Sequence, residues 1–281
     1  MRPDPVPAKL TSAVARARMA PVLPVLLELR DWGHEAYLVG GGIRDLLLGR
    51  EGGDWDIATS ARPEEMLAYW PRAVPTGARH GTVTLPLAEG PVEITAYRTE
   101  GPYTDGRHPD WVRFGASIEE DLARRDFTVN AMAFDPHAAV FADPQGGLAD
   151  LSAGVIRTVG DPDARFGEDG LRPLRGARFA AVLEFSVDPA TLAAMGRARA
   201  GLARVARERV RDELVKLLAA PRPSVGIEIL RETGLLEDIL PELLEGVGME
   251  QNRFHAHTVY EHTLRTLDAA PAARPVVRLA A

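Results

Sequence analysis

Residues 38–56 read LVGGGIRDLLLGREGGDWD, a stretch that joins three glycines, an Arg-Asp pair and two carboxylates. Before the glycines, Glu35–Val39 has the apolar pattern of a buried strand. After them, Ile43–Leu48 predicts a helix whose first turn follows the glycines directly. Glycine brings backbone N–H groups close to a ligand, and a helix N-terminus favours phosphate. A strand, a glycine turn and a helix in this order predict a phosphate-binding turn.

Three residues of this turn are the candidate phosphate ligands. Gly41 and Gly42 permit close approach of the backbone, and the Arg44 guanidinium can donate charge-assisted hydrogen bonds. Taken alone, a triple glycine is most often an ordinary tight turn, and Arg44 beside Asp45 is most often a surface ion pair. The combination with a strand, a helix and two nearby carboxylates favours nucleotide binding over these structural interpretations.

Asp54 and Asp56 form the carboxylate pair of the stretch. They are one residue apart on the next expected strand, so their side chains would point to the same face. Mg²⁺ prefers oxygen ligands and the phosphates of a substrate. A lone DxD is more often a solvated strand edge, but beside a phosphate-binding turn it predicts metal-dependent phosphoryl or nucleotidyl transfer.

The composition limits the classes of protein that fit the chain. Its 281 residues suffice for two or more domains, and the lack of cysteine excludes disulfides and thiolate metal sites. Neither a signal peptide nor an apolar run of membrane-spanning length is visible, so we expect a soluble cytoplasmic protein without membrane contact. The net charge of −7 argues mildly against a general nucleic-acid binder but does not exclude RNA binding.

Arginine dominates the basic residues, because only Lys9 and Lys216 among the 33 are lysines. Arginine suits bidentate contacts to phosphates and base edges, although a GC-rich genome produces the same bias. Six arginines lie within residues 197–211 (RARAGLARVARERVR). This cluster predicts either a solvated helix face or a contact with an RNA backbone.

The hydrophobic periodicity changes character near residue 150. Before it, strands and helices mix, which predicts an α+β fold built on a mixed sheet; after Phe166 the pattern is helical. The polar, Gly- and Pro-rich segment Gly101–Gly115 predicts a flexible loop. Expected strands are Trp55–Ala58, Thr82–Leu87 and Val92–Tyr97, and expected helices are Val22–Trp32, Pro63–Tyr69, Ile118–Arg125, Gly170–Phe179, Pro189–Ala200, Arg207–Leu218, Ser224–Thr233 and Leu235–Leu240.

Several stretches together resemble one known family. GGGIRDLLLGR followed by DWDIATSARPEE is similar to the head-domain signature of class II nucleotidyltransferases, which comprise the tRNA CCA-adding enzymes and bacterial poly(A) polymerases. The resemblance continues through Arg124–Ala133 (RRDFTVNAMA) and Arg165–Phe179 (RFGEDGLRPLRGARF), and covers roughly residues 36–245. It implies a polymerase β-like head domain over residues 1–150, a helical neck over 151–220 and a helical body over 221–281.

The resemblance also implies roles for the polar residues of the expected head domain. Asp54 and Asp56 would be catalytic ligands of Mg²⁺, with Glu93 on a neighbouring strand as a candidate third carboxylate. In RRDFTVNA, Arg125, Asp126 and Asn130 would contact the nucleotide, with Asp and Asn reading ribose hydroxyls. A helix-capping Asp126 and a satisfied buried Asn130 are the structural alternative.

The segment EDGLRPLRGAR would read the incoming base. Asp169, Arg172, Arg175 and Arg178 recur every three residues, which places them on one face if the segment is a helix. In the family that the segment resembles, the matching Asp and first Arg hydrogen-bond the Watson–Crick edge of C and then A, so that protein replaces a template. Without the resemblance, a salt-bridged surface helix is an equal alternative. Departures from the family pattern are three helix-unfriendly spacers, Gly170, Pro173 and Gly176.

Two local features separate the activities within the family. Thr76–Thr84 (TGARHGTVT) is similar to the HGT stretch of CCA-adding enzymes, and the full-length loop Gly101–Gly115 disfavours enzymes that add only CC. We therefore expect addition of C and A from CTP and ATP to the 3′ end of tRNA. An A-only enzyme, a poly(A) polymerase and a non-catalytic RNA- or nucleotide-binding module remain as alternatives.

Residues 253–268 (RFHAHTVYEHTLRTLD) are similar to the opening of HD-type phosphohydrolase domains, with His262 as the matching ligand. No partner His-Asp pair follows before Ala281, so we expect no HD activity and a surface His262. The apolar end PVVRLAA suggests a truncated chain.

Overall fold

The computed structural model describes residues 4–50, 54–104, 109–251 and 256–280. Contacts between Cα atoms divide the chain into two compact units. The first comprises Met1–Pro102 and Pro109–Leu151, and the second comprises Ser152–Ala281 with Tyr103–His108. This division falls close to the head boundary expected near residue 150, while a separate body over residues 221–281 stays a prediction. Residues 105–108 of the expected loop and 253–255 of the HD-like segment lie outside the described residues.

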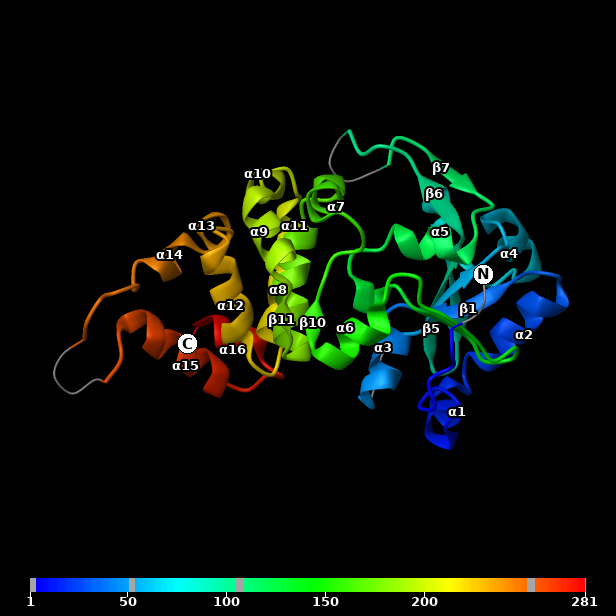
Figure 1. Cartoon of the computed structure of the whole chain (residues 1–281), viewed down its shortest axis with the longest axis horizontal. Coiled ribbons are helices and arrows are strands. Elements are labelled where there is room, and N and C mark those ends of the chain that lie inside the picture. The colour runs from blue at the N-terminus through cyan, green and yellow to red at the C-terminus, as the bar shows by residue number, and fades with distance from the viewer. Residues whose placement is uncertain (1–3, 51–53, 105–108, 252–255, 281) are drawn as a thin grey trace. The chain divides into compact units, whose positions relative to one another are not determined.

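A seven-stranded mixed sheet forms the centre of the first unit (Figure 1). Its order is β3-β4-β5-β2-β1-β8-β9, in which only β2 and β5 run parallel. The mixed sheet confirms the α+β expectation, and the strands are β1 (Ala36–Val39), β2 (Asp56–Thr59), β3 (Val74–Gly77), β4 (Thr82–Leu87), β5 (Gly90–Ala96), β8 (Ala133–Asp135) and β9 (Val140–Ala142).

The alternation of side chains along these strands decides which residues reach the core. Leu38, Ile57 and Ile94 are fully buried, whereas Glu93, next to Ile94, is exposed. Because strand side chains alternate between two faces, the β2–β5 pairing that buries Ile57 with Ile94 also places Asp56 opposite Glu93.

Helices α2, α3 and α4 pack against strands β1 and β4 of this sheet. Helix α3 begins at Gly41, two residues after β1 ends at Val39, as the glycine turn predicts. The helical elements of the unit are α1 (Ala13–Met19), α2 (Leu23–Asp31), α3 (Gly41–Leu48), α4 (Pro63–Tyr69), η1 (Ala78–His80), α5 (Ile118–Ala123), η2 (Thr128–Asn130) and α6 (Gly147–Ala153).

The segment Gly101–Gly115, expected to be a loop, is partly a strand. Residues Val112–Phe114 form β7, which pairs antiparallel with β6 (Arg98–Glu100). The Trp111 indole Nε1 would lie 2.5 Å from a Cβ on Gly101, so glycine allows the two chains to approach. The prediction of an irregular loop was therefore wrong for its C-terminal part, because paired backbone can compensate for a composition poor in strand formers.

The second unit is helical apart from one short parallel pair, β10 (Val155–Ile156) with β11 (Ser186–Val187). Helix α8 packs between α11 and α12, and its buried Leu174 and Ala177 contribute to the core. The helices are α7 (Pro162–Glu168), α8 (Arg172–Leu183), α9 (Pro189–Arg197), α10 (Arg199–Leu202), α11 (Arg207–Leu218), α12 (Pro223–Glu232), α13 (Leu236–Ile239), α14 (Pro241–Leu244), α15 (Val259–Ala269) and α16 (Pro275–Ala280).

Two of the unusual spacers in EDGLRPLRGAR have local reasons. Pro173 lies in the first turn of α8, where its missing N–H costs nothing. Gly170 lies before the helix, and a Cβ there would stand 2.3 Å from the Gly201 carbonyl oxygen. The expected helix over residues 170–179 therefore starts two residues later, and Gly170 permits a close backbone contact.

We expect Gly170→Ala to destabilise the protein by about 1–3 kcal/mol, because the new methyl group must displace backbone atoms. Gly167→Ala is the matched control: it lies in α7, where a Cβ meets nothing within 4 Å. Alanine has a higher helix propensity than glycine, so the Gly167→Ala protein should be more stable by up to about 1 kcal/mol. Urea unfolding measures both, and equal stability of the two variants would contradict the close contact.

Candidate nucleotide and metal site

The turn between β1 and α3 begins the candidate site. Gly40 adopts φ +69°, and a Cβ on it would lie 3.1 Å from Asp56 Oδ2 and 3.2 Å from Arg125 Nη1. Both its conformation and its neighbours therefore require glycine. Gly41 and Gly42 were predicted as phosphate ligands, whereas Gly40, the first residue of the triple glycine, was missed.

The two predicted glycines have different surroundings. A Cβ on Gly41 would stand 3.4 Å from Arg44 Nη2, which is close but tolerable. A Cβ on Gly42 would stand 2.8 Å from the Trp55 ring, so this buried glycine lets α3 pack on Trp55. Packing accounts for Gly42, and a phosphate-binding role for either glycine stays a prediction.

Asp56, at the start of β2, has a raised pKa. Burial raises the pKa of its carboxyl group from 3.8 to about 6, Arg125 opposes that rise, and the charges of Glu93 and Asp54 add to it. Glu93 is the β5 residue that pairs with Asp56, and Asp54 lies exposed just before β2. Accumulated negative charge of this kind fits a cation.

A third metal ligand from the protein is not established. Within the described residues, no three His, Asp or Glu side chains form a group that could hold a metal ion. Asp54 and Asp56 remain the predicted ligands, and the participation of Glu93 stays a prediction.

Arg44, on α3, connects the glycine turn to the segment around Asn130. Its guanidinium donates to both carboxylate oxygens of Asp45, at 2.9 and 3.1 Å, and to Asn130 Oδ1 at 2.7 Å. Arg44 is 8% exposed, so the pair with Asp45 is not the surface ion pair considered above. Asn130 Nδ2 donates to Asp126 Oδ1 at 3.2 Å, which joins three predicted site residues in one network.

The structural alternative holds for Asn130, whereas η2 begins without a side-chain cap from Asp126. Asp126 Oδ1 accepts from the Phe127 N–H at 2.8 Å, and Asn130 is buried with both amide atoms bonded. Arg125 places Nη1 3.4 Å from the Asn130 carbonyl oxygen and Nη2 3.4 Å from Asp121 Oδ2. Its Nε is buried without a hydrogen-bond partner among the described residues. The Arg125 side chain therefore has an unused hydrogen-bond donor near the Asp56 carboxylate.

The second unit carries the predicted base-reading residues. Asp169 lies between α7 and α8, outside the helix, so it does not share a helix face with the arginines as expected. Its Oδ1 accepts from the Leu171 N–H at 3.0 Å, and Arg209 donates to both of its carboxylate oxygens at 3.2 and 2.7 Å. The bond from the Leu171 N–H closes a turn at Asp169, so this residue stands before the helix that begins at Arg172.

The three arginines of the segment lie on α8 and pair with acidic groups of their own unit. Arg172 bonds the Arg165 carbonyl at 2.8 Å and the Glu168 carboxylate. Arg178 and Arg175 both approach the buried Glu213, at 2.5 and 3.6 Å. Arg209 and Glu213 were missed as members of this site, because their partners lie about 40 residues earlier.

The arginine cluster at residues 197–211 is mostly held in ion pairs. Exposed pairs join Arg197 to Asp163 and Arg199 to both Glu237 and Asp238. Arg209 binds Asp169, and Arg211 binds its neighbour Asp212. Four of the six arginines thus have acidic partners within the unit, which leaves Arg204 and Arg207 as the exposed candidates for RNA contact.

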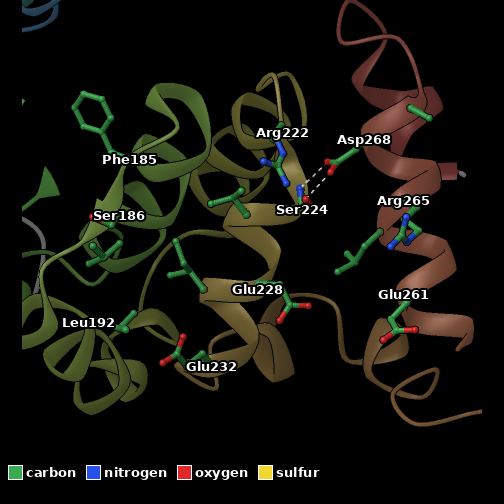
Figure 2. A pocket seen from close by; sticks show the side chains of 15 residues that line it. Phe185, Ser186, Leu192, Arg222, Ser224, Glu228, Glu232, Glu261, Arg265 and Asp268 are labelled. Atoms are coloured by element: carbon green, nitrogen blue, oxygen red, sulfur yellow. Dashed lines mark hydrogen bonds between the residues drawn. The ribbon is translucent and has the colours of Figure 1, made fainter. Parts of the chain in front are cut away.

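A separate pocket of the second unit, about 990 Å³, lies between α12 and α15 (Figure 2). Asp268 closes one end of it by accepting from the Ser224 N–H at 3.0 Å and from its hydroxyl at 2.6 Å. None of the predicted site residues lines this pocket. His262 is exposed on α15, as expected.

Similarity to known proteins agrees with this geometry. Residues 36–157 match the poly A polymerase head domain, and residues 184–246 match the "probable RNA and SrmB-binding site of polymerase A". A CCA-adding enzyme of Geobacillus thermodenitrificans is 46% identical over 223 residues, which are 79% of this chain and 55% of that enzyme.

Solved structures of the same kind share the fold. The Bacillus stearothermophilus CCA-adding enzyme in complex with CTP is 36% identical, with a TM-score of 0.74 over 93% of this chain and 65% of that one. A tRNA nucleotidyltransferase complexed with a primer tRNA and an incoming ATP analogue is 31% identical, with a TM-score of 0.64 over 86% of this chain and 65% of that one.

The first unit is thus a polymerase β-like nucleotidyltransferase head domain, followed by a helical region. The chain belongs to the family of class II tRNA nucleotidyltransferases and bacterial poly(A) polymerases, and the relatives that it matches include CCA-adding enzymes. It spans about half the length of the curated relatives it matches. None of the helices in its described part combines the length and apolarity needed to cross a bilayer.

We expect Asp56→Asn to stabilise the metal-free protein at pH 8. The raised pKa of Asp56 means that its proton stabilises the fold below about pH 4, and that this contribution is lost as the pH rises through about 6. The amide avoids that loss, which is on the order of 2–3 kcal/mol.

Urea unfolding in EDTA at pH 5 and pH 8 measures the difference. The gain in the free energy of unfolding of Asp56→Asn should be large at pH 8 and smaller at pH 5. The control Asp31→Asn, at an exposed position of α2, should change the free energy of unfolding little at either pH. A less stable Asp56→Asn at pH 8 would contradict the electrostatic description of the site.

Proposed function

We propose that the chain carries a Mg²⁺-dependent activity that adds C and A nucleotides, without a nucleic-acid template, to the 3′ end of tRNA. CTP and ATP are the substrates, and the proposal places the protein in the cytoplasm with its tRNA. The observation that carries it is the half-buried Asp56 carboxylate beside Gly40 and Arg125, with Glu93 opposite. The similarity to CCA-adding enzymes supports the choice of substrates.

The carboxylates of Asp54 and Asp56 would hold the metal ions, with Glu93 as the candidate third ligand. Bound Mg²⁺ supplies neutralisation of phosphate charge and activation of the attacking 3′-hydroxyl. Asp56 must be ionised for this role, and Arg125 beside it favours the ionised form by lowering its pKa.

The network around Arg44 would bind the rest of the nucleotide. The α3 N-terminus and Arg44 favour the triphosphate. Asp126 and Asn130 would read the ribose hydroxyls, and Arg125 offers its unpartnered Nε. Asn130 holds Arg44 and Asp126 in fixed positions, so the residues are arranged before a ligand arrives.

Asp169 and Arg172 would select the base. A carboxylate accepts from the exocyclic amine that both C and A present, while a guanidinium donates to a ring nitrogen or carbonyl. In this structure Asp169 is bonded to Arg209 and Arg172 to Glu168. An incoming base must share or displace these partners, so Arg209 and Glu168 set the geometry in which the base is read.

The runner-up is a poly(A) polymerase. The HGT stretch forms the end of β3, η1 and the start of β4. It favours CCA addition, because it resembles the corresponding stretch of CCA-adding enzymes and not the Arg-rich equivalent of bacterial poly(A) polymerases. Use of CTP separates the two tRNA enzymes: a CCA-adding enzyme incorporates C, whereas an A-only enzyme does not. A non-catalytic binding module would bind tRNA or nucleotide without incorporation.

Incorporation of labelled CTP and ATP, separately and together, tests the proposal. The substrates are tRNAs lacking all three, two or one of the CCA nucleotides, with a generic RNA for comparison. We expect CTP to enter the first two tRNAs and ATP only the last. Incorporation of ATP alone into generic RNA would identify a poly(A) polymerase instead.

Asp56→Ala tests the metal assignment in the same assay. Incorporation should fall at least about a hundredfold while tRNA binding changes little, because the charge at the reacting phosphates is no longer neutralised. Asp31→Ala, which removes an exposed aspartate of the same unit, is the control. Undiminished incorporation by Asp56→Ala would refute the assignment.

A further inference from the structure

Asp121, on α5, is a fully buried carboxylate that the proposed chemistry does not use. Buried carboxylates are costly unless they are paired and hydrogen-bonded. We propose that Asp121 is a positioning residue: it holds the Arg125 guanidinium beside Asp56, where Arg125 binds the incoming nucleotide. The inference rests on the proposed function and assigns a residue that directs the same site.

Two arginines that follow α5 pair with the two oxygens of Asp121. Arg124 donates to Oδ1 from Nε at 3.0 Å and from Nη2 at 2.7 Å. Arg125 donates to Oδ2 from Nη2 at 3.4 Å. The carboxylate thus bonds firmly to Arg124 on one side and directs its other oxygen at Arg125.

Arg124 is itself fixed by the strand pair β6–β7. Its Nη1 lies 3.3 Å from Glu100 Oε1, and the same oxygen accepts from Arg98 Nε at 2.7 Å. At the other end, the capping box of Ser117 and Glu120 fixes the start of α5. Asp121 is therefore held from two directions, so that its position does not depend on Arg125.

Within the part of the chain that the structure describes, Arg125 has no other strong anchor. Nη1 reaches the Asn130 carbonyl oxygen at 3.4 Å and lies near Gly40 and Asp56, while Nε is buried without a partner among the described residues. Without the Asp121 charge, the guanidinium is attracted mainly to Asp56. It would then move toward the metal carboxylate and away from the nucleotide.

Asp121→Asn removes the charge and keeps the shape of the side chain. In CTP incorporation we expect the KM for CTP to rise about tenfold with kcat changed less than about threefold, because nucleotide binding is lost rather than chemistry. Glu119→Gln removes an acid from the same helix without these bonds, and is the matched control.

A double-mutant cycle with Arg125→Ala separates positioning from general stabilisation. If Asp121 acts through Arg125, Asp121→Asn raises the KM of the Arg125→Ala protein by less than about twofold. If it only supports the fold, its effect is the same in both backgrounds, which would overturn the proposal. Should Asp121→Asn fail to fold, the same cycle with Asp121→Glu, which keeps the charge but shifts it, gives the same decision.

The inference and the proposed function fail in different ways. A wild-type chain that binds CTP but incorporates nothing refutes the activity, and calorimetric CTP binding then decides the inference. Weaker CTP binding by Asp121→Asn, absent from the Arg125→Ala background, supports the positioning role. Equal CTP binding by wild type and Asp121→Asn overturns it.

Discussion

The Asp56 carboxylate, half-buried beside two other acids, is the constraint on which the rest of the first unit depends. Burial, Glu93 and Asp54 disfavour its ionised form, and Arg125 favours it. The turn at Gly40 has room for Asp56 and Arg125 only because it lacks a side chain. The fold tolerates this unfavourable charge at the place where a cation and a triphosphate would relieve it, which is common at functional sites.

The second unit handles its charged residues differently, since each predicted base-reading residue there has a partner of opposite charge. Asp169 is bound by Arg209, Arg172 by Glu168, and Arg175 and Arg178 by Glu213. Such pairs add little net stability but fix side chains in one arrangement. A protein that selects a base without a nucleic-acid template needs its hydrogen-bonding groups fixed in this way, because no complementary strand corrects their position.

Sequence patterns predicted much of the fold, because β1, α3 and α4 have strong local signals in their apolar periodicity, glycines and proline. Gly40 was missed because the sequence does not show its positive φ. Its two charged neighbours, Asp56 and Arg125, come from other parts of the chain. The spacing of three that joined Asp169 to Arg172 was misleading, since Asp169 lies in a turn before the helix, where its side chain accepts from the Leu171 N–H. Long-range partners such as Arg209 leave no local signal at all.

The most direct measurement of the central claim is binding of Mn²⁺, a spin-active substitute for Mg²⁺, followed by electron paramagnetic resonance on the 281-residue chain. A cation that relieves the charge around Asp56 should bind saturably, compete with Mg²⁺ and bind more weakly as the pH falls below about 6. Asp56→Asn should abolish this binding. Equal Mn²⁺ affinity in wild type and Asp56→Asn would contradict the account.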